Sequence, residues 1–499
     1  MTKLEQLKER LGVVTDLNGA ASVLGWDQQT YMPPGGAAAR AEQLATLGRL
    51  AHEALISEET GELLEGASTE VTGLPSDSDE MCLLRVVRRD FERARKVPAT
   101  LVAEIARATS LGMEVWIRAR AESSFTAFQP AFQRILDLQR QLAQCLGFEE
   151  SPYDALLDQY EPGMKKSDLV RIFGELKAGL VPLVQWVAER LDRVDDSILH
   201  RKYPEASQWE LGIEAAKAFG YDFQRGRQDK SVHPFTTSFS INDVRITTRV
   251  DEQFLPSALF GTLHECGHAL YEQGISQTLE RTPLASGASL GVHESQSRLW
   301  ENLVGRSRGF WRFFLPQLQR TFPENLQSVA PESFYRAINR VEPSLIRVEA
   351  DEVTYNLHIL LRFELESRLV EGKLDLAALP EAWNAGMKAL LGIVPSNDAQ
   401  GVLQDVHWSN GLIGYFPTYA LGNLISVQLF EKAQSEIPSL AARIESGDFQ
   451  PLLGWLRQNV HQHGRKHLPS ELVERATGTG LRASSYLRYL REKYSEIYG

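Results

Sequence analysis

Apolar residues recur at every third or fourth position along most of this chain, the spacing that places them on one face of a helix. Breaks between these stretches fall at proline and glycine clusters, such as the PPGG run at 33–36. The pattern therefore predicts a mainly α-helical protein. The predicted amphipathic helices span residues 2–24, 37–57, 80–95, 98–122, 126–147, 166–196, 207–219, 330–342, 344–372, 376–391, 410–446, 449–461 and 484–497.

The segment 238–250 has a different pattern, because apolar and polar residues alternate there. The alternation continues on both sides of Asn242-Asp243, a pair that suits a tight turn, so we predict a β-hairpin. An exposed edge of this hairpin could accept an extended peptide as an extra strand. A small structural hairpin without such a role is the alternative.

Two further helices are predicted, from Pro256 to Gly274 and from Leu290 to Val304. Proline suits the first turn of a helix, and glycine suits the position where a helix ends. Each helix has an apolar face, and each also carries polar residues beside that face. Cys266 falls on the apolar side of the first helix, so we expect it to pack in the core.

The first of these helices contains His264-Glu265-Cys266-Gly267-His268, an H-E-x-x-H sequence. Residues four apart lie on one helix face, so His264 and His268 can bind the same metal ion. Glu265 stands beside them, where a carboxylate can take a proton from the attacking water. This pattern is the signature of zinc peptidases. Two unrelated histidines on an ordinary helix are the alternative.

A zinc peptidase needs a third protein ligand, and we predict that it is Glu294 on the second helix. The third histidine that metzincins carry shortly after H-E-x-x-H is absent. Glu294 completes a set of two histidines and one glutamate, while Glu280, His293 and Glu301 remain alternative ligands. The Glu294 face also bears Arg298 and Glu301, which suit a layer of residues around the ligands, although a solvated face would look the same.

The overall composition is ordinary for a soluble globular protein, with 43% hydrophobic and 24% charged residues among 499. The formal net charge of −12 disfavours nucleic acids and anionic membranes as partners. Neither a signal-peptide core nor a membrane-spanning apolar run is evident, and the three cysteines form no disulfide or zinc pattern. A cytoplasmic location is therefore predicted. No linker or repeat divides the chain, so we expect one domain over residues 1–499.

Six short motifs occur in the order in which they stand in a known family. They are HPF at 233–235, DVRIT at 243–247, HECGH at 264–268, HESQ at 293–296, IRVEAD at 346–351 and GVLQDVHW at 401–408. With these motifs the chain resembles the thermostable metallocarboxypeptidases, also called the carboxypeptidase Taq family. GWDQ at 25–28 and Met32-Pro33 also fit, so the resemblance covers nearly the whole chain.

The resemblance implies a cytosolic, homodimeric, metal-dependent carboxypeptidase that removes C-terminal residues broadly and disfavours proline. It implies one divalent metal ion per chain, zinc first, with cobalt or manganese as alternatives. It also implies a helical fold with a deep central groove, similar to neurolysin and angiotensin-converting enzyme. In a soft subdivision, residues 1–230 would cover the groove, 231–430 would hold the metal and the groove, and 431–499 would form C-terminal helices.

One position departs from the wider clan of zinc peptidases. Many of its members carry an acidic residue four positions after the glutamate ligand, and this chain has Arg298 there. The group that orients His264 or His268 is therefore left open by the sequence.

A carboxypeptidase must bind the terminal carboxylate of its substrate, and a guanidinium can do so through two parallel hydrogen bonds. Arg347, in a predicted helix, and Arg245, on the hairpin, are the candidates, with salt bridges as their alternative role. His407 could donate a hydrogen bond to a substrate carbonyl. Tyr415 and Tyr419, four residues apart, could stabilise the developing oxyanion, and structural packing is the alternative for all three residues.

These observations favour a zinc-type carboxypeptidase that acts on peptide substrates. An endo-acting zinc oligopeptidase, which needs no clamp for a terminal carboxylate, is the first alternative. A non-catalytic helical scaffold with a degenerate metal site is the second.

Overall fold

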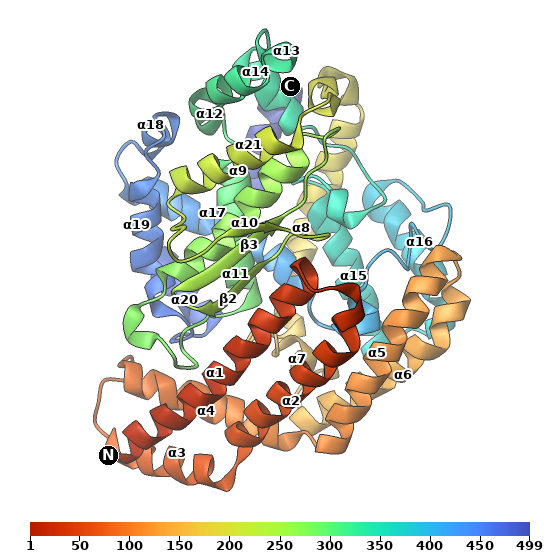
Figure 1. Cartoon of the computed structure of the whole chain (residues 1–499). Helices are drawn as coiled ribbons and strands as arrows, with labels where there is room; N and C mark the ends of the chain where they lie inside the picture. The colour runs from red at the N-terminus through yellow and green to blue at the C-terminus, as the bar shows by residue number, and fades with distance from the viewer. The chain divides into compact units, whose positions relative to one another are not determined.

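The computed structural model describes residues 1–499, and helices account for most of them (Figure 1). The longer helices are α1 (Lys3–Thr30), α2 (Ala37–Ile56), α3 (Glu58–Glu70), α4 (Asp79–Lys96), α5 (Ala99–Ala121), α6 (Phe125–Leu146), α8 (Lys166–Ala188), α9 (Glu205–Phe219), α10 (Pro256–Gly274), α12 (Arg308–Thr321), α15 (Tyr355–Val370), α16 (Leu379–Leu391), α17 (Pro417–Glu436), α19 (Gln450–Asn459) and α21 (Ala483–Tyr498). The shorter ones are α7 (Pro152–Leu157), α11 (Leu290–Arg298), α13 (Pro323–Leu326), α14 (Pro331–Ile338), α18 (Leu440–Glu445) and α20 (Pro469–Thr477). The strands are β1 (Gln228–Lys230), β2 (Thr236–Ser240) and β3 (Asp243–Thr248).

The mainly α class with a small sheet, predicted from the sequence, is confirmed. The deep groove and the likeness to neurolysin and angiotensin-converting enzyme stay predictions.

The chain forms two compact units that alternate along the sequence. Unit 1 consists of Met1–Arg95, Asp196–Ile338 and Leu429–Thr479. Unit 2 consists of Lys96–Asp195, Asn339–Gln428 and Gly480–Gly499. Their boundaries differ from the subdivision at 230 and 430, because contacts between segments distant in sequence define the units. The single domain over 1–499 stays a prediction.

A three-stranded sheet lies beside helix α10 in unit 1 (Figure 1). Strand β3 is central, with β1 parallel to it on one side and β2 antiparallel on the other. The predicted hairpin is confirmed as β2 and β3. Strand β1 was not predicted, because three residues are too few to show an alternating pattern. Helices α9 and α11 also pack against α10, so this helix has neighbours on several sides.

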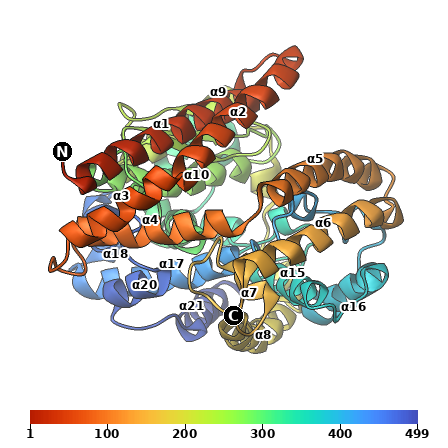
Figure 2. The same cartoon turned by 90° about the horizontal axis from the view of Figure 1, so that it is seen from below.

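The N-terminal helices of unit 1 form a pair that is anchored to the sheet. Helices α1 and α2 run side by side (Figure 2), and α1 also contacts β2. A side chain at Gly19 would approach the carbonyl oxygen of Phe239 to 3.0 Å. Near the end of α1, the Trp26 ring contacts the guanidinium groups of Arg227 and Arg245, at 5.6 and 4.4 Å from the ring centroid. Trp26, from the GWDQ motif at 25–28, therefore packs α1 against the two arginines.

Helix α15 is almost wholly buried in unit 2, where it contacts α6, α7, α8 and α16. The helix predicted over 344–372 is correct only in its second part, because residues 344–354 are mostly irregular. The carboxylate of Asp351 accepts hydrogen bonds from the backbone N–H groups of Val353 and Thr354. This side chain thus stabilises a turn ahead of α15 and competes with a continuous helix.

Other helix boundaries also differ from the prediction. Helix α12, which contains Pro316 in its interior, was not predicted. Helices α3 and α20 were also missed. The helix predicted over 410–446 is wrong in its first residues, because α17 begins at Pro417.

A carboxyl group lies in the core of unit 2 without a cationic hydrogen-bond partner. Glu366 on α15 accepts hydrogen bonds from the indole N–H of Trp408 at 2.7 Å, the hydroxyl of Tyr153 at 3.0 Å and the N–H of Gly414 at 3.1 Å. Burial outweighs these donors and raises the pKa of Glu366 to about 7. The folded chain therefore keeps a proton on Glu366 under conditions where the unfolded chain releases it.

We predict that Glu366 makes the folded protein less stable as the pH rises from about 4.5 to about 7. A carboxyl with a raised pKa contributes stability below its unfolded pKa and loses it above the folded pKa, on the order of 3 kcal/mol here. Thermal midpoints should show this slope in the natural chain and a flatter profile in Glu366→Gln. Glu364→Gln, which alters an exposed carboxyl of the same helix, is the control. Equal slopes in the natural chain and Glu366→Gln would contradict the prediction.

Candidate metal centre

Helices α10 and α11 approach closely enough to bring three predicted ligands together. Gly267 lies at the contact, since a side chain there would come within 2.6 Å of the carbonyl oxygen of Gln296 and the Cα of Ser297. Helix α10 spans Pro256–Gly274, as predicted. Cys266 is fully buried, which confirms its expected place in the core. The small residue inside the H-E-x-x-H motif thus allows α11 to lie against the histidine-bearing helix.

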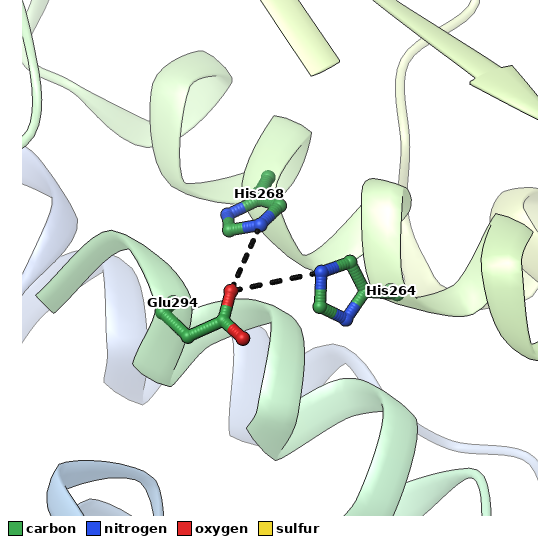
Figure 3. A group of neighbouring side chains, drawn as sticks. All are labelled: His264, His268 and Glu294. Carbon is green, nitrogen blue, oxygen red and sulfur yellow. Dashed lines mark ion pairs between the residues drawn. The ribbon is translucent and has the colours of Figure 1, made fainter. Parts of the chain in front are cut away.

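His264, His268 and Glu294 form one cluster (Figure 3). An Oε2 atom of Glu294 lies 3.6 Å from the Nε2 of His264 and 3.4 Å from the Nε2 of His268. The three potential ligand atoms all lie within 4.8 Å of one another. Two imidazole nitrogens and one carboxylate oxygen in this arrangement make a donor set suited to a divalent metal such as zinc.

The electrostatics of the cluster also fit a cation. Burial would lower the pKa of His264, but the carboxylate of Glu294 and its acidic neighbours outweigh burial and raise it. Burial and the nearby His293 lower the pKa of His268 to about 3, so this ring is neutral. Burial opposes ionisation of Glu294, yet Arg298 and the two histidines hold its pKa well below the usual value. The neutral His268 and the ionised Glu294 are already in the states that bind a metal, and the raised pKa of His264 reflects carboxylates that attract positive charge to the site.

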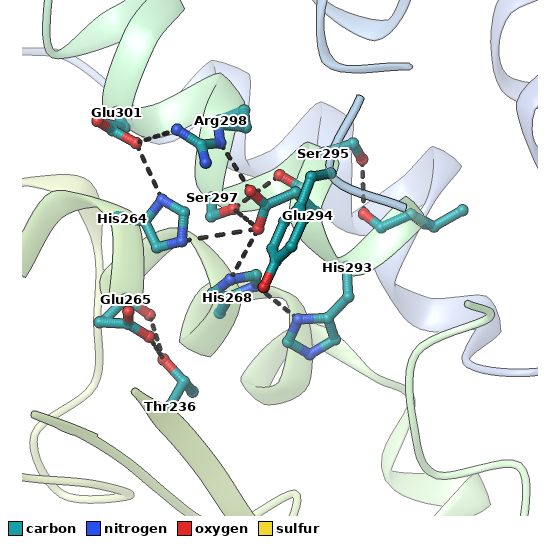
Figure 4. Close-up of polar contacts among 12 residues, drawn as sticks. Thr236, His264, Glu265, His268, His293, Glu294, Ser295, Ser297, Arg298 and Glu301 are labelled. Carbon is teal, nitrogen blue, oxygen red and sulfur yellow. Dashed lines mark hydrogen bonds and ion pairs between the residues drawn. The ribbon is translucent and has the colours of Figure 1, made fainter. Parts of the chain in front are cut away.

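A second layer of residues holds the ligands in place (Figure 4). The Nδ1 of His264 lies 2.9 Å from a carboxylate oxygen of Glu301. Arg298 contacts both Glu294, at 2.7 Å, and Glu301, at 3.3 Å. The hydroxyl of Ser297 donates to Glu294 at 3.1 Å. Glu301 thus orients His264, and Arg298 holds the carboxylates of Glu294 and Glu301 in place.

Glu301 lies in the turn Leu299–Val304, which continues α11 as a π-helix. A π-helical turn changes the direction of side chains relative to an α-helix, and such turns are frequent at functional sites. The predicted helix over 290–304 is therefore present, but its second half is wider than the sequence suggests.

Glu265 is buried between the metal cluster and the sheet. Its carboxylate accepts a hydrogen bond from the hydroxyl of Thr236 on β2, at 2.7 Å. Burial raises the pKa of Glu265. A carboxylate with a raised pKa is a better proton acceptor, which suits a general base.

The alternative ligands lie outside the three-residue cluster. The Nδ1 of His293 lies 2.6 Å from the Nδ1 of His268, on the ring edge that faces away from Glu294. Glu280 accepts a hydrogen bond from the backbone N–H of Ile241, at 3.0 Å. Glu301 contacts His264 through Nδ1, whereas Glu294 faces the Nε2 atom. These contacts support Glu294 as the third ligand.

Two polar residues of the site were missed in the sequence. Thr236 contacts Glu265, and Glu272 on α10 contacts His293 at 2.8 Å. Glu272 stands four residues after His268, so its helical spacing could have revealed it. Thr236 gave no such signal, because its contact joins a strand to a helix 29 residues away.

Four other predicted site residues come together in unit 2. The Nε2 of His407 lies 3.2 Å from the hydroxyl of Tyr419, and the ring of Tyr415 lies 5.4 Å from that of Tyr419. Burial lowers the pKa of His407 to about 3, so its imidazole is neutral. Arg347 lies in a short 3₁₀ turn (Arg347–Glu349), outside any α-helix, and its guanidinium lies 5.1 Å from the Tyr419 ring.

Arg347 is paired with groups of the protein itself. Its Nε and Nη2 donate to one oxygen of Asp405, at 3.0 and 2.7 Å, and its Nη1 donates to the hydroxyl of Tyr355 at 2.9 Å. Arg362 contacts the other oxygen of Asp405. Asp405 thus lies between two buried guanidinium groups.

Arg245 has a different environment, in unit 1. Its Nε and Nη2 donate to the carboxylate of Asp243, at 2.9 and 2.8 Å. The guanidinium also lies against the rings of Trp26 and Phe239, at 4.4 and 4.8 Å. These contacts favour the structural role that the sequence left open for Arg245.

Nearly the whole chain is similar to known proteins. The model of the Carboxypeptidase Taq (M32) metallopeptidase family matches residues 6–494. The chain belongs to this family. Thermostable carboxypeptidase 1 of Thermus thermophilus is 46% identical over 97% of this chain and 96% of its own length. Carboxypeptidase 1 of Bacillus subtilis is 37% identical over 97% and 96%.

A solved structure of the Carboxypeptidase Taq family supports the fold. The M32 carboxypeptidase of Deinococcus radiodurans has a TM-score of 0.97 and 43% identity, with coverage of 100% of this chain and 99% of the other. Membership makes the chain a metal-dependent carboxypeptidase, a hydrolase of peptide bonds, and implies a divalent metal. None of the helices combines the length and the apolar character needed to cross a membrane.

We predict that Glu294→Ala weakens zinc binding by more than about 100-fold, which exceeds the ~10–100-fold effect typical of residues behind the ligands. Glu301→Ala should fall within that smaller range, because Glu301 acts through His264. Glu280→Ala is the control and should bind zinc normally. Competition with a chelator measures all three affinities. A zinc-free Glu280→Ala together with a normal Glu294→Ala would overturn the assignment.

Proposed function

We propose that the chain is a zinc-dependent carboxypeptidase that releases C-terminal residues from peptides broadly and disfavours proline. The observation that carries this proposal is the convergence of His264, His268 and Glu294, with Glu265 buried beside them. Two nitrogen donors and one oxygen donor favour zinc, and cobalt or manganese could replace it. A homodimer in the cytoplasm, as the family resemblance implies, is part of the same proposal.

The chemistry divides between the metal and the side chains of the protein. When bound, a divalent metal polarises the scissile carbonyl and makes water more acidic. Glu265 accepts a proton from the attacking water and passes it to the leaving amine. Thr236 holds the carboxylate of Glu265 in a fixed direction through its 2.7 Å hydrogen bond. The hydrogen bond from Thr236 thus orients the carboxylate that accepts the proton and passes it on.

Arg347, His407 and the two tyrosines supply recognition and charge stabilisation in this proposal. Arg347 binds the terminal carboxylate of the substrate, and its burial among aromatic rings makes such a pair strong. Because Asp405 is shared with Arg362, it can remain paired when Arg347 turns a donor toward substrate. Tyr419 or Tyr415, with the neutral His407, donates hydrogen bonds to the oxyanion. Arg245 is the second choice for the clamp.

Two alternative functions would each give a different experimental result. An endo-acting oligopeptidase would cleave free-acid and amidated peptides alike. A non-catalytic scaffold would purify without stoichiometric metal, which elemental analysis detects.

We predict that Glu265→Gln keeps its metal but loses at least about 100-fold in kcat, the usual scale for loss of a general base. The amide retains the size of the carboxylate and can still bond Thr236, so the fold should not change. Metal content and turnover are measured on the same preparation. Near-normal turnover, or complete loss of metal, would rule out the base role.

We also predict that amidating the C-terminus of a peptide lowers kcat/KM by roughly tenfold to a hundredfold. The lost charge-assisted hydrogen bonds are worth ~1.5–3 kcal/mol each, and ~1.4 kcal/mol corresponds to one decade. Arg347→Ala should lower kcat/KM for the free acid similarly and abolish the preference over the amide.

Lysine at position 347 should restore only part of this activity, because an ammonium group cannot form the two-pronged contact. Arg245→Ala is the matched variant, since it removes a guanidinium of unit 1 that is already paired. If both alanine variants keep the full preference for free acids, the carboxylate clamp lies elsewhere. No preference in the natural chain would favour the endopeptidase.

A further inference from the structure

Helix α10 carries a third functional side chain on the face of its two histidines. Glu272 follows His268 by four residues, one helical turn further on, and it is buried. Its Oε1 lies 2.8 Å from the Nε2 of His293. The other nitrogen of that ring, Nδ1, lies 2.6 Å from the Nδ1 of His268. Glu272, His293 and His268 therefore form a continuous chain of contacts that ends at a metal-binding imidazole.

With a metal bound, the ring orientations determine which nitrogens carry the protons. His268 turns its Nε2 toward Glu294, at 3.4 Å, so this nitrogen must be unprotonated to bind a metal. The proton of the neutral ring is then on Nδ1, which donates to the Nδ1 of His293. His293 carries its own proton on Nε2, which donates to Glu272. This arrangement gives each of the two contacts one donor and one acceptor.

Strand β2 supports the far end of the chain of contacts. The hydroxyl of Ser238 donates to the second oxygen of Glu272, at 3.2 Å. Thr236, two residues earlier and hence on the same face of the strand, donates to Glu265. The sheet thus holds both carboxylates of α10 that face the site.

The two metal-binding histidines differ in what stands behind them. His264 contacts the carboxylate of Glu301 directly, at 2.9 Å. His268 reaches the carboxylate of Glu272 only through the imidazole of His293. Partners of this kind fix the tautomer and the direction of a metal-binding imidazole.

We propose that His293 and Glu272 are positioning residues that hold His268 with its Nε2 turned toward the metal. This inference rests on the metal site of the proposed function. In this proposal His293 supports the ligand His268 and is not itself a ligand. Glu272, which has no other role in the proposed reaction, supports His293.

Metal affinity and the spectrum of bound cobalt test the proposal without reference to activity. His293→Phe keeps a ring but removes both nitrogens, and we expect it to weaken zinc binding by about 10–100-fold. His293→Asn keeps an acceptor near the position of Nδ1 but loses the contact with Glu272, so it should recover part of that loss. Glu272→Leu should weaken zinc binding in the natural background. The visible bands of cobalt should shift in His293→Phe, because the geometry at His268 changes.

A double variant shows whether Glu272 acts through His293. In the His293→Asn background the link to Glu272 is cut, so adding Glu272→Leu should cause little further loss of affinity. Tyr271→Phe is the matched control. Tyr271 contacts the His293 ring at 5.4 Å and accepts a hydrogen bond from Ala288, but it lies outside the chain of contacts. Its loss should leave the cobalt spectrum unchanged.

The outcomes of this experiment separate failure of the positioning role from failure of the proposed function. Normal zinc affinity and an unchanged cobalt spectrum in both His293→Phe and Glu272→Leu would overturn the positioning role alone. Equal losses from Glu272→Leu in both backgrounds would show that Glu272 does not act through His293, which also overturns it. If His293→Phe does not fold, Glu272→Leu and the double variant still decide. A natural chain that binds no metal would refute the proposed function, and the positioning role with it.

Discussion

The close approach of α11 to α10 at Gly267 is the constraint on which the metal site depends. A β-carbon at this position would lie 2.6 Å from backbone atoms of α11, so any larger residue would separate the two helices. Glu294 would then move away from His264 and His268, which it now approaches to 3.6 and 3.4 Å. The site is thus a property of helix packing as much as of its ligands.

The same packing concentrates charge in a buried place. Carboxylates of Glu265, Glu294 and Glu301 lie near the two histidines, and Arg298 and Arg306 compensate part of this charge. Buried carboxylates without compensation are costly, and a divalent cation removes that cost. A bound divalent metal would therefore offset the remaining negative charge, which links metal binding to the stability of the fold. In unit 2 the buried carboxylate of Asp405 is instead compensated by two arginines, Arg347 and Arg362.

Local patterns predicted most of the site but not its surroundings. The bounds of α10, the hairpin and the choice of Glu294 could be predicted because helical spacing, alternation and ligand chemistry are local signals. Glu301 was expected in the layer around the ligands, but its contact with His264 could not be predicted, since it depends on a π-helical turn that leaves no mark in the hydrophobic pattern. The helix predicted through Arg347 failed because Asp351 binds the backbone ahead of α15. The two units, whose segments alternate along the sequence, are defined by contacts between residues far apart in the chain, and a short stretch of sequence gives no signal of such contacts.

X-ray absorption spectroscopy of the zinc-loaded protein tests the central claim most directly, because it counts the atoms around the metal. The proposed site predicts two imidazole nitrogens together with oxygen ligands, at distances of about 2.0–2.2 Å, and no sulfur. Three imidazoles would make His293 a ligand and remove it from its place behind His268. A sulfur atom would implicate Cys266, which is buried in the core. Either result, or the absence of imidazole, would contradict the site described here.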